Sequence, residues 1–119
     1  MVEMWLQESD PFDLIAYLDV QIKWSATVFG DGKRTEGILK HIESEIIEVR
    51  DEPEDVEEWV DIVVLALDGA WRAGHSPKQI CEAMQKKQIK NLRRKWHVPK
   101  SENEPVMHVK SCLEKGVEQ

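Results

Sequence analysis

One segment of the sequence restricts the fold more than any other part of the chain. From Trp59 to Leu67 every residue except Asp61 is apolar. Asp55 can cap a helix before this segment, and Gly74 predicts where that helix ends. A helix that is apolar on nearly every face has to be covered on nearly every face, so we expect it to be the buried central helix of an all-α protein. Three neighbouring helices do not easily cover such a helix, which predicts an oligomer that buries the remainder.

Two helices are predicted before this central helix, and no segment shows the convincing alternation of a β-strand. Asp10, which precedes a proline, predicts the N-cap of a first helix that runs to about Thr27 or Val28. The glycines that follow predict a loop. Thr35 can cap a second helix over about 36–51, and a proline soon after ends it.

A fourth helix and a more polar segment follow the central helix. Residues 76–79, Ser-Pro-Lys-Gln, form a capping box with proline at the first helical position, which predicts a helix to about Trp96. Further on, Val106, Val109 and Leu113 are spaced to line one face of a short terminal helix. Four or five helices of this length are typical of a bundle.

Composition and charge narrow the functional classes. We expect a single domain over 1–119, with its core at about 10–97 and a C-terminal extension at 98–119. No apolar run approaches the ~20 residues of a membrane span, and the first residues do not resemble a secretory signal. The two cysteines show no metal or disulfide spacing, so we expect a reducing, cytoplasmic location. The net charge of −7 argues against a nucleic-acid binder, which needs a positive surface.

The second helix carries an acidic residue where a core residue is expected. Glu45 lies seven residues after Ile38, three after Ile42 and four before Val49, which places it within their apolar stripe. Glu48 follows one turn later. A carboxylate at a core-facing position indicates a function, because burial without a partner is costly.

The third helix offers a matching pair, Glu58 and Asp61, which are three residues apart and share a face. A short loop makes the second and third helices antiparallel neighbours, so the two pairs should face each other. Four converging carboxylates raise one another's pKa values, and a divalent cation relieves that repulsion. Oxygen ligands suit Mg²⁺, for which Mn²⁺ can substitute. The alternative is a solvated acidic face, which we accept for four other acids: Glu43, Glu52, Glu54 and Glu57.

The fourth helix is cationic and is the expected phosphate-binding element. Lys87, Asn91 and Arg94 share one face. The adjacent stripe consists of Lys86, Lys90 and Arg93. We expect the first stripe to bind triphosphate oxygens through charge-assisted hydrogen bonds and the second to be solvated.

Together these residues resemble a known family. The segments 41–48 (HIESEIIE) and 58–61 (EWVD) resemble the E-x-x-E … E-x-x-D signature of the MazG-like all-α nucleotide pyrophosphohydrolases. Ser44 stands where that signature often has the first of two adjacent glutamates. The closer similarity is to the dATP/dGTP diphosphohydrolase branch, and it lies in these segments: Trp24-Ser25, 29–37 (FGDGKRTEG), 58–61, 67–74 (LDGAWRAG) and Lys87 to Trp96.

The resemblance covers roughly 20–97 and implies a fold, a reaction and an assembly. It implies a MazG-like bundle of four to five helices that forms a homodimer or homotetramer. It also implies Mg²⁺-dependent cleavage between the α- and β-phosphates of a purine deoxynucleoside triphosphate, dGTP or dATP. Phage relatives of this branch supply dGMP for DNA that contains diaminopurine, which makes a phage one candidate source.

In this mechanism Glu45, Glu48, Glu58 and Asp61 would hold the metal ions against the triphosphate. Glu45 would also orient or deprotonate the attacking water, and the Lys87, Asn91 and Arg94 stripe would bind the phosphates.

Three further residues are candidates for substrate binding, and each has a structural alternative. Arg34 beside the glycine loop can reach phosphate or be an ordinary surface arginine. His41 can hydrogen-bond the substrate or a carboxylate, or it can be an ordinary helix histidine whose hydrogen bonds are satisfied without a functional role. Trp24 can stack on the base, although core packing is the more common role of a tryptophan on a helix.

Two rival functions remain open from the sequence. One is a pyrimidine or housecleaning pyrophosphohydrolase that acts on dUTP, dCTP or damaged nucleotides. The other is a non-catalytic helical interaction module with an acidic binding face, against which the apolar neighbours of Glu45 and Asp61 argue.

Overall fold

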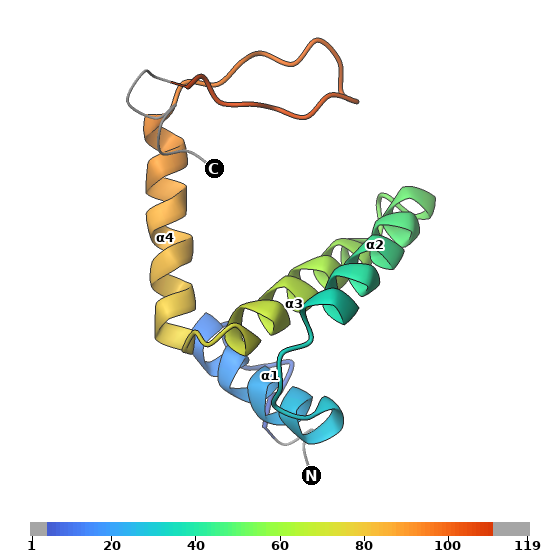
Figure 1. Ribbon diagram of the computed structural model, residues 1–119, viewed down its shortest axis with the longest axis vertical. Helices are drawn as coiled ribbons and strands as arrows, with labels where there is room; N and C mark the ends of the chain where they lie inside the picture. Colours follow the sequence, from blue (N-terminus) through green and yellow to red (C-terminus); the bar gives the residue numbers. More distant parts are fainter. Residues whose placement is uncertain (1–4, 111–119) are drawn as a thin grey trace. The chain divides into compact units, whose positions relative to one another are not determined.

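The computed structural model describes residues 5–110, and this part of the chain contains four α-helices and no β-strand (Figure 1). The helices are α1 (Leu14–Phe29), α2 (Thr35–Asp51), α3 (Val56–Arg72) and α4 (Pro77–Arg93). The predicted all-α class is confirmed. Two compact units divide the chain, the first ending at Glu82 and the second beginning at Ala83. In the described part, every helix is too short or too polar to cross a membrane.

Helix α1 begins three residues later than predicted. Asp13 is its N-cap, and the carboxylate of Asp13 accepts a hydrogen bond from the main-chain N–H of Ala16 at 3.2 Å. Asp10, the predicted cap, accepts instead from the main-chain N–H of Gln7 at 3.1 Å. Because Asp10 closes the preceding turn in this way, the assignment of Asp10 as the helix cap is wrong.

The later helix boundaries follow the capping chemistry of the sequence more closely. Asp55 caps α3 by accepting from the main-chain N–H of Glu57 at 3.0 Å. The capping box at the start of α4 is confirmed, since Ser76 and Gln79 exchange hydrogen bonds of 2.9 and 3.2 Å. At α2 the helix starts at Thr35 itself, so Thr35 is not the cap.

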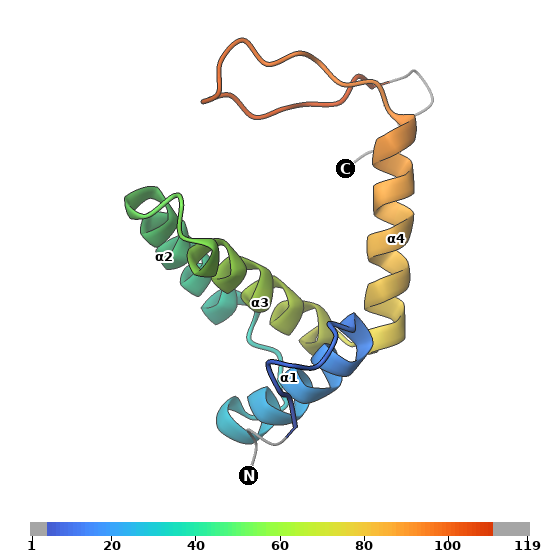
Figure 2. The same cartoon turned by 180° about the vertical axis from the view of Figure 1, so that it is seen from behind.

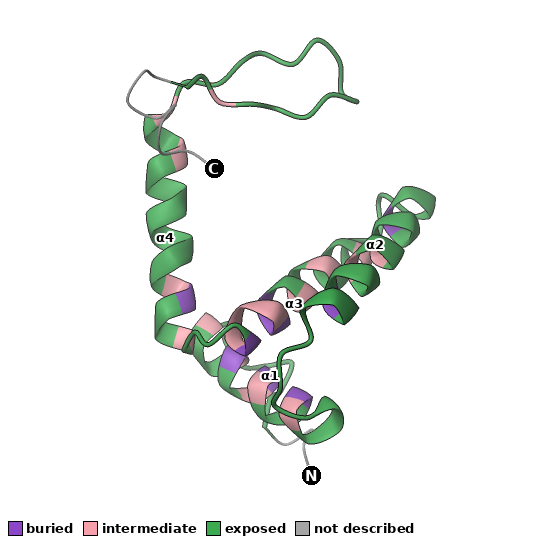
Figure 3. Ribbon diagram, in the orientation of Figure 1, coloured by how far each residue is buried: buried purple, intermediate pink, exposed green. Residues whose placement is uncertain are grey.

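Helices α2 and α3 lie side by side as an antiparallel pair, as Figures 1 and 2 both show. Ile38 and Val49 of α2 are buried. The main core cluster of the first unit joins Leu18 of α1, Leu67 of α3 and Ile80 in the first turn of α4. Buried residues therefore gather where α1 meets the end of α3, while the outer face of α2 is exposed (Figure 3).

Within the single chain α3 is covered on only some of its faces, which agrees with the expectation that its neighbouring helices do not cover it completely. Helix α3 packs against α1 and α2, but Trp59, Val60 and Val63 are all exposed. Two helices can cover only part of a helix that is apolar on most of its faces. An oligomer that covers these residues stays a prediction.

The chain after α4 is extended rather than helical within the described residues. Helix α4 ends at Arg93, earlier than predicted, and Trp96 forms an isolated antiparallel bridge with His108. The main-chain N–H of Val109 donates to the carbonyl of Lys95 at 2.7 Å. Because this pairing uses the main-chain groups that a helix would need, the predicted terminal helix is wrong at Val106 and Val109. Its third member, Leu113, lies outside the described residues.

A buried ion pair joins the parts of the first unit. Arg72 is 5% exposed, and its Nε donates to Asp68 Oδ2 at 3.0 Å. The same guanidinium donates to the carbonyl oxygens of Gly30 and Gly32, both at 2.8 Å. The Ser25 hydroxyl donates to Asp68 Oδ1 at 2.7 Å. This network therefore connects α1, α3 and the loop between α1 and α2.

Arg72→Met should lower the free energy of unfolding by about 3–5 kcal/mol, because it leaves Asp68 as a buried charge without its cation. Arg50→Met is the control, since Arg50 is exposed on α2 and its loss should change stability by less than about 1 kcal/mol. Urea unfolding followed by circular dichroism measures both. Equal, small losses in the two variants would show that the network does not stabilise the fold.

Candidate active site

A cavity of about 280 Å³ lies among α1, α2 and α3, within the first unit of the chain. Its wall combines acidic, aromatic and polar side chains from all three helices. The lining residues are Gln21, Trp24, Ser25, Phe29, Arg34, His41, Glu45, Asp61, Val64, Leu65 and Asp68.

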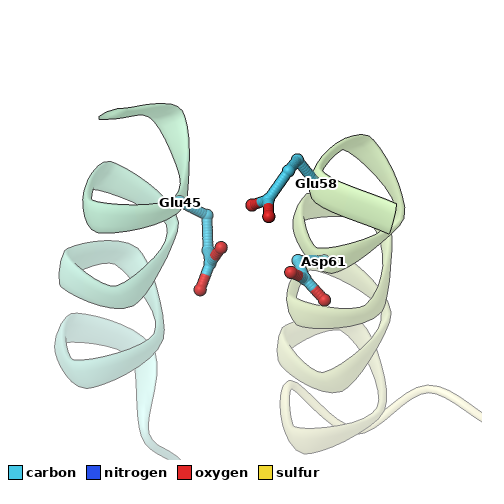
Figure 4. A group of neighbouring side chains, drawn as sticks. All are labelled: Glu45, Glu58 and Asp61. Atoms are coloured by element: carbon cyan, nitrogen blue, oxygen red, sulfur yellow. The ribbon is translucent and has the colours of Figure 1, made fainter. Parts of the chain in front are cut away.

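Three carboxylates form a cluster next to this cavity, and two of them, Glu45 and Asp61, line it. Glu45 comes from α2, and Glu58 and Asp61 come from α3. One oxygen from each of the three lies within 4.8 Å of the others. Figure 4 shows that Glu45 points across the gap between the two helices toward the pair on α3. The antiparallel helix pair thus brings the predicted acidic residues together.

The pKa of Glu58 reflects this crowding. Desolvation of its half-buried side chain raises the pKa of that carboxyl above the ordinary value, and the negative charge of Asp61 raises it further. The charges of Glu48, Asp55 and Glu45 act in the same direction. Removing or neutralising charge at this position therefore favours the folded state.

Glu48 is the one predicted metal ligand outside the three-residue cluster. Its side chain is exposed on α2, one turn beyond Glu45. It is still near enough to raise the pKa of Glu58. Glu48 as a fourth ligand stays a prediction.

The acidic cluster suits a hard divalent cation. All of its donors are carboxylate oxygens, which Mg²⁺ and Mn²⁺ prefer over nitrogen or sulfur. Desolvation and the neighbouring negative charges both raise the pKa of Glu58, so its charged form is disfavoured where it stands. A cation with two positive charges would neutralise the charge of the cluster and would leave room for phosphate and water ligands.

Three of the predicted substrate-binding residues line the same cavity. Trp24 is 44% exposed, so it is not a core residue, and its ring meets Phe29 edge to face at 5.8 Å. The guanidinium of Arg34 lies 5.0 Å from the Phe29 ring centre. His41 Nε2 lies 3.2 Å from Glu45 Oε1, which bears out contact between this histidine and a carboxylate.

The predicted phosphate-binding stripe lies on and just after α4, beyond residue 82, and it divides between two grooves. Lys87 and Asn91 line one groove. Arg94 follows the last residue of α4 and lines another groove together with Lys86 and Lys90. The shared face that was expected for Lys87, Asn91 and Arg94 is therefore split, because the helix ends at Arg93. Their contacts with phosphate stay predictions.

The sequence analysis assigned no role to three buried polar residues of the cavity wall. Gln21, Ser25 and Asp68 are all buried. Glu45 was identified as a polar residue at a core-facing position of a helix. The same pattern is present for two of the three, because Gln21 and Ser25 follow Leu14 and Leu18 at helical spacing on the core-facing side of α1. Asp68 continues the face of Glu58 and Asp61 at helical spacing, and it also lies in the family-like segment 67–74.

One of three comparisons with known proteins gives a match. No curated protein and no solved structure gives a significant match to the chain. The family model described as dATP/dGTP pyrophosphohydrolase matches residues 17–115, which include every residue of the cavity and of the acidic cluster. The match extends over most of the sequence and names a nucleoside triphosphate diphosphatase. The chain therefore belongs to the dATP/dGTP pyrophosphohydrolase family.

Proposed function

We propose that this enzyme hydrolyses dATP or dGTP, with Mg²⁺ as its metal, to the nucleoside monophosphate and pyrophosphate. The observation that carries the proposal is the cluster of Glu45, Glu58 and Asp61, of which Glu45 and Asp61 line a cavity that Trp24 also lines. Metal ligands and an aromatic surface for a base are the two parts that a nucleotide enzyme needs in one place. The family match supports the substrate class.

Glu45, Glu58 and Asp61, with Glu48 beside them, would hold the metal. When bound, Mg²⁺ would neutralise phosphate charge and lower the pKa of a coordinated water. Glu45 would orient the attacking water or accept its proton, and the contact with His41 would fix the direction of that carboxylate. Arg34, Lys87, Asn91 and Arg94 would bind phosphate oxygens.

The bond changes are simple. The water oxygen forms a bond to the α-phosphorus, and the bond from that phosphorus to the bridging oxygen breaks. Pyrophosphate leaves with the electron pair, and the proton of the water passes to Glu45. Cations that face the leaving group would stabilise its charge.

The assembly and the compartment follow from the same proposal. A homodimer or homotetramer is supported by the exposed Trp59, Val60 and Val63 on α3. The cytoplasm is the compartment in which deoxynucleoside triphosphates are available.

A substrate panel tests the function directly. The purified protein is incubated with dATP, dGTP, dUTP, dCTP and oxidised nucleotides in Mg²⁺, and the monophosphate and pyrophosphate are quantified. Preference for dATP or dGTP supports the proposal. Preference for dUTP, dCTP or oxidised nucleotides would assign the chain to pyrimidine or housecleaning hydrolysis instead.

Glu58→Gln should lower kcat/KM by at least about 100-fold, since even groups that only support metal ligands cost 10–100-fold when removed. The same change should stabilise the metal-free protein. The folded state raises the pKa of Glu58, so the metal-free wild type loses stability as the pH rises from the ordinary glutamate pKa through the raised one. The stability of metal-free Glu58→Gln should not fall over this pH range, because glutamine does not titrate. Activity assays and thermal unfolding from pH 4 to 8 measure the two effects.

Glu57→Gln is the matched control for this metal prediction, because Glu57 is the exposed neighbour on α3. Glu57→Gln should keep full activity, and Mg²⁺ should stabilise this variant as much as it stabilises the wild type. Full activity in Glu58→Gln would contradict the metal site.

Hydrolysis in water enriched in oxygen-18 should place the label in the monophosphate and leave pyrophosphate unlabelled. Attack at the α-phosphorus predicts this result, and mass spectrometry of the products measures it. Label in pyrophosphate, or release of orthophosphate with a nucleoside diphosphate, would show that another bond is cleaved.

Lys87→Ala and Arg94→Ala should each lower kcat/KM by about ten- to a hundredfold, because a hydrogen bond to a charged group is worth about 1.5–3 kcal/mol. Lys86→Ala is the matched control, since it removes an exposed cation one residue away on α4. Its effect should stay below about fivefold. A large effect at Lys86 with none at Lys87 would assign phosphate binding to the groove that Lys86 and Arg94 line.

A further inference from the structure

Gln21 is a buried polar side chain at the wall of the cavity, with only 6% of its surface exposed. Its Nε2 donates a hydrogen bond to the main-chain carbonyl of Val64 on α3 at 2.9 Å. This bond sets the orientation of the amide, because the reversed amide would place two carbonyl oxygens against each other. Oε1 is therefore the free end of the side chain.

The acceptor Oε1 has no hydrogen-bond partner among the described residues, although it is almost completely closed to solvent. Buried side-chain polar atoms nearly always have a partner, and an exception calls for a ligand, a water or a strained function. The nearest polar members of the wall on α1 and α3 do not supply one. Ser25 donates to Asp68, and Asp68 also accepts from Arg72.

The position of this unsatisfied acceptor is informative. Gln21 lies one helical turn before Trp24 and Ser25 on α1, and all three line the cavity that also contains Glu45 and Asp61. An exposed aromatic ring and a buried acceptor are the two groups that recognise a nucleobase, one by stacking and one by hydrogen bonding. An acceptor selects a base that presents an N–H donor.

We propose that Gln21 is a specificity-determining residue whose Oε1 accepts a hydrogen bond from the exocyclic amino group of the substrate purine. The inference rests on the proposed hydrolysis of dATP or dGTP, since it names a contact in that substrate complex. Because Oε1 is closed to solvent, the base reaches it when side chains of the cavity wall rotate. A base without the amino group would leave Oε1 buried and unpaired in the complex.

Amino-deficient substrates test the contact in the wild-type enzyme. The value of kcat/KM is measured for dGTP against dITP, which lacks the 2-amino group, and for dATP against deoxynebularine triphosphate, which lacks the 6-amino group. The amino-bearing member should be preferred by about ten- to a hundredfold in at least one pair, which is the range expected for leaving one buried acceptor unpaired. The pair that shows the preference identifies the amino group.

Gln21→Leu tests whether Gln21 is the source of this preference. The substitution removes the acceptor, so the ratio within the discriminating pair should fall to about one, chiefly through loss of the faster substrate. Thr27→Val is the matched control on α1, because Thr27 also donates to a helix carbonyl, that of Lys23 at 2.8 Å, but on the exposed face. It should keep the ratio of the wild type. Gln21→Met serves as a second variant of similar size if Gln21→Leu does not fold.

The outcomes separate this inference from the proposed function. Equal kcat/KM values within both pairs, or a ratio that survives in Gln21→Leu and Gln21→Met, would overturn the role of Gln21 while hydrolysis itself stands. Absence of monophosphate and pyrophosphate from all four nucleotides would overturn both the function and the contact that rests on it. The wild-type comparison needs no variant, so a failure of the variants to fold leaves the contact testable.

Discussion

The buried charge of Arg72 is the constraint on which the first unit depends. Its guanidinium pairs with Asp68, donates to two loop carbonyls and lies 4.5 Å from the Trp71 ring centre. A buried guanidinium needs partners for most of its donors, so the loop between α1 and α2 has to turn its carbonyls inward. Gly30 permits this turn with a φ of 82°, a conformation that other residues rarely adopt. The start of α2, and Arg34 before it, are placed by the same contacts.

Asp68 and the acidic cluster of Glu45, Glu58 and Asp61 are treated differently by the fold. Asp68 has its cation, Arg72, within the same helix one turn later, so its charge is neutralised by the chain. Among the described residues, the basic side chain that contacts this cluster is His41, which lies against Glu45 and carries charge only when protonated. The first arrangement stabilises the fold without a ligand. The second would gain stability from an external cation, as a metal site does and a structural ion pair does not.

Local features of the sequence predicted local features of the structure. The cap at Asp55 and the capping box at Ser76 depend on neighbouring residues, and both are confirmed. Helix periodicity and a short loop brought Glu45 opposite Glu58 and Asp61. The bond between Ser25 and Asp68 joins residues 43 apart, so it depends on how α1 crosses α3, which periodicity does not determine. The prediction of Asp10 rather than Asp13 as the cap failed for a related reason, because two similar signals lay within three residues and one turn contact decided between them.

The order of residues along α3 assigns the two ends of the proposed substrate. Glu58, Asp61, Leu65 and Asp68 recur at helical spacing, and at 1.5 Å per residue they extend over about 15 Å. The acidic end of this stripe would hold the metal and the phosphates. The other end is fixed by Arg72, and Val64, the partner of Gln21, lies between Asp61 and Asp68. A base would therefore be read between the acidic cluster and the Arg72 network, where the bond to Val64 holds the buried acceptor, while the reacting phosphate would meet the end that holds the metal. Selection of a base depends on fixed geometry more than on charge, whereas phosphate binding depends on charge. Base recognition and phosphate binding would therefore each lie where the chain supplies what they need.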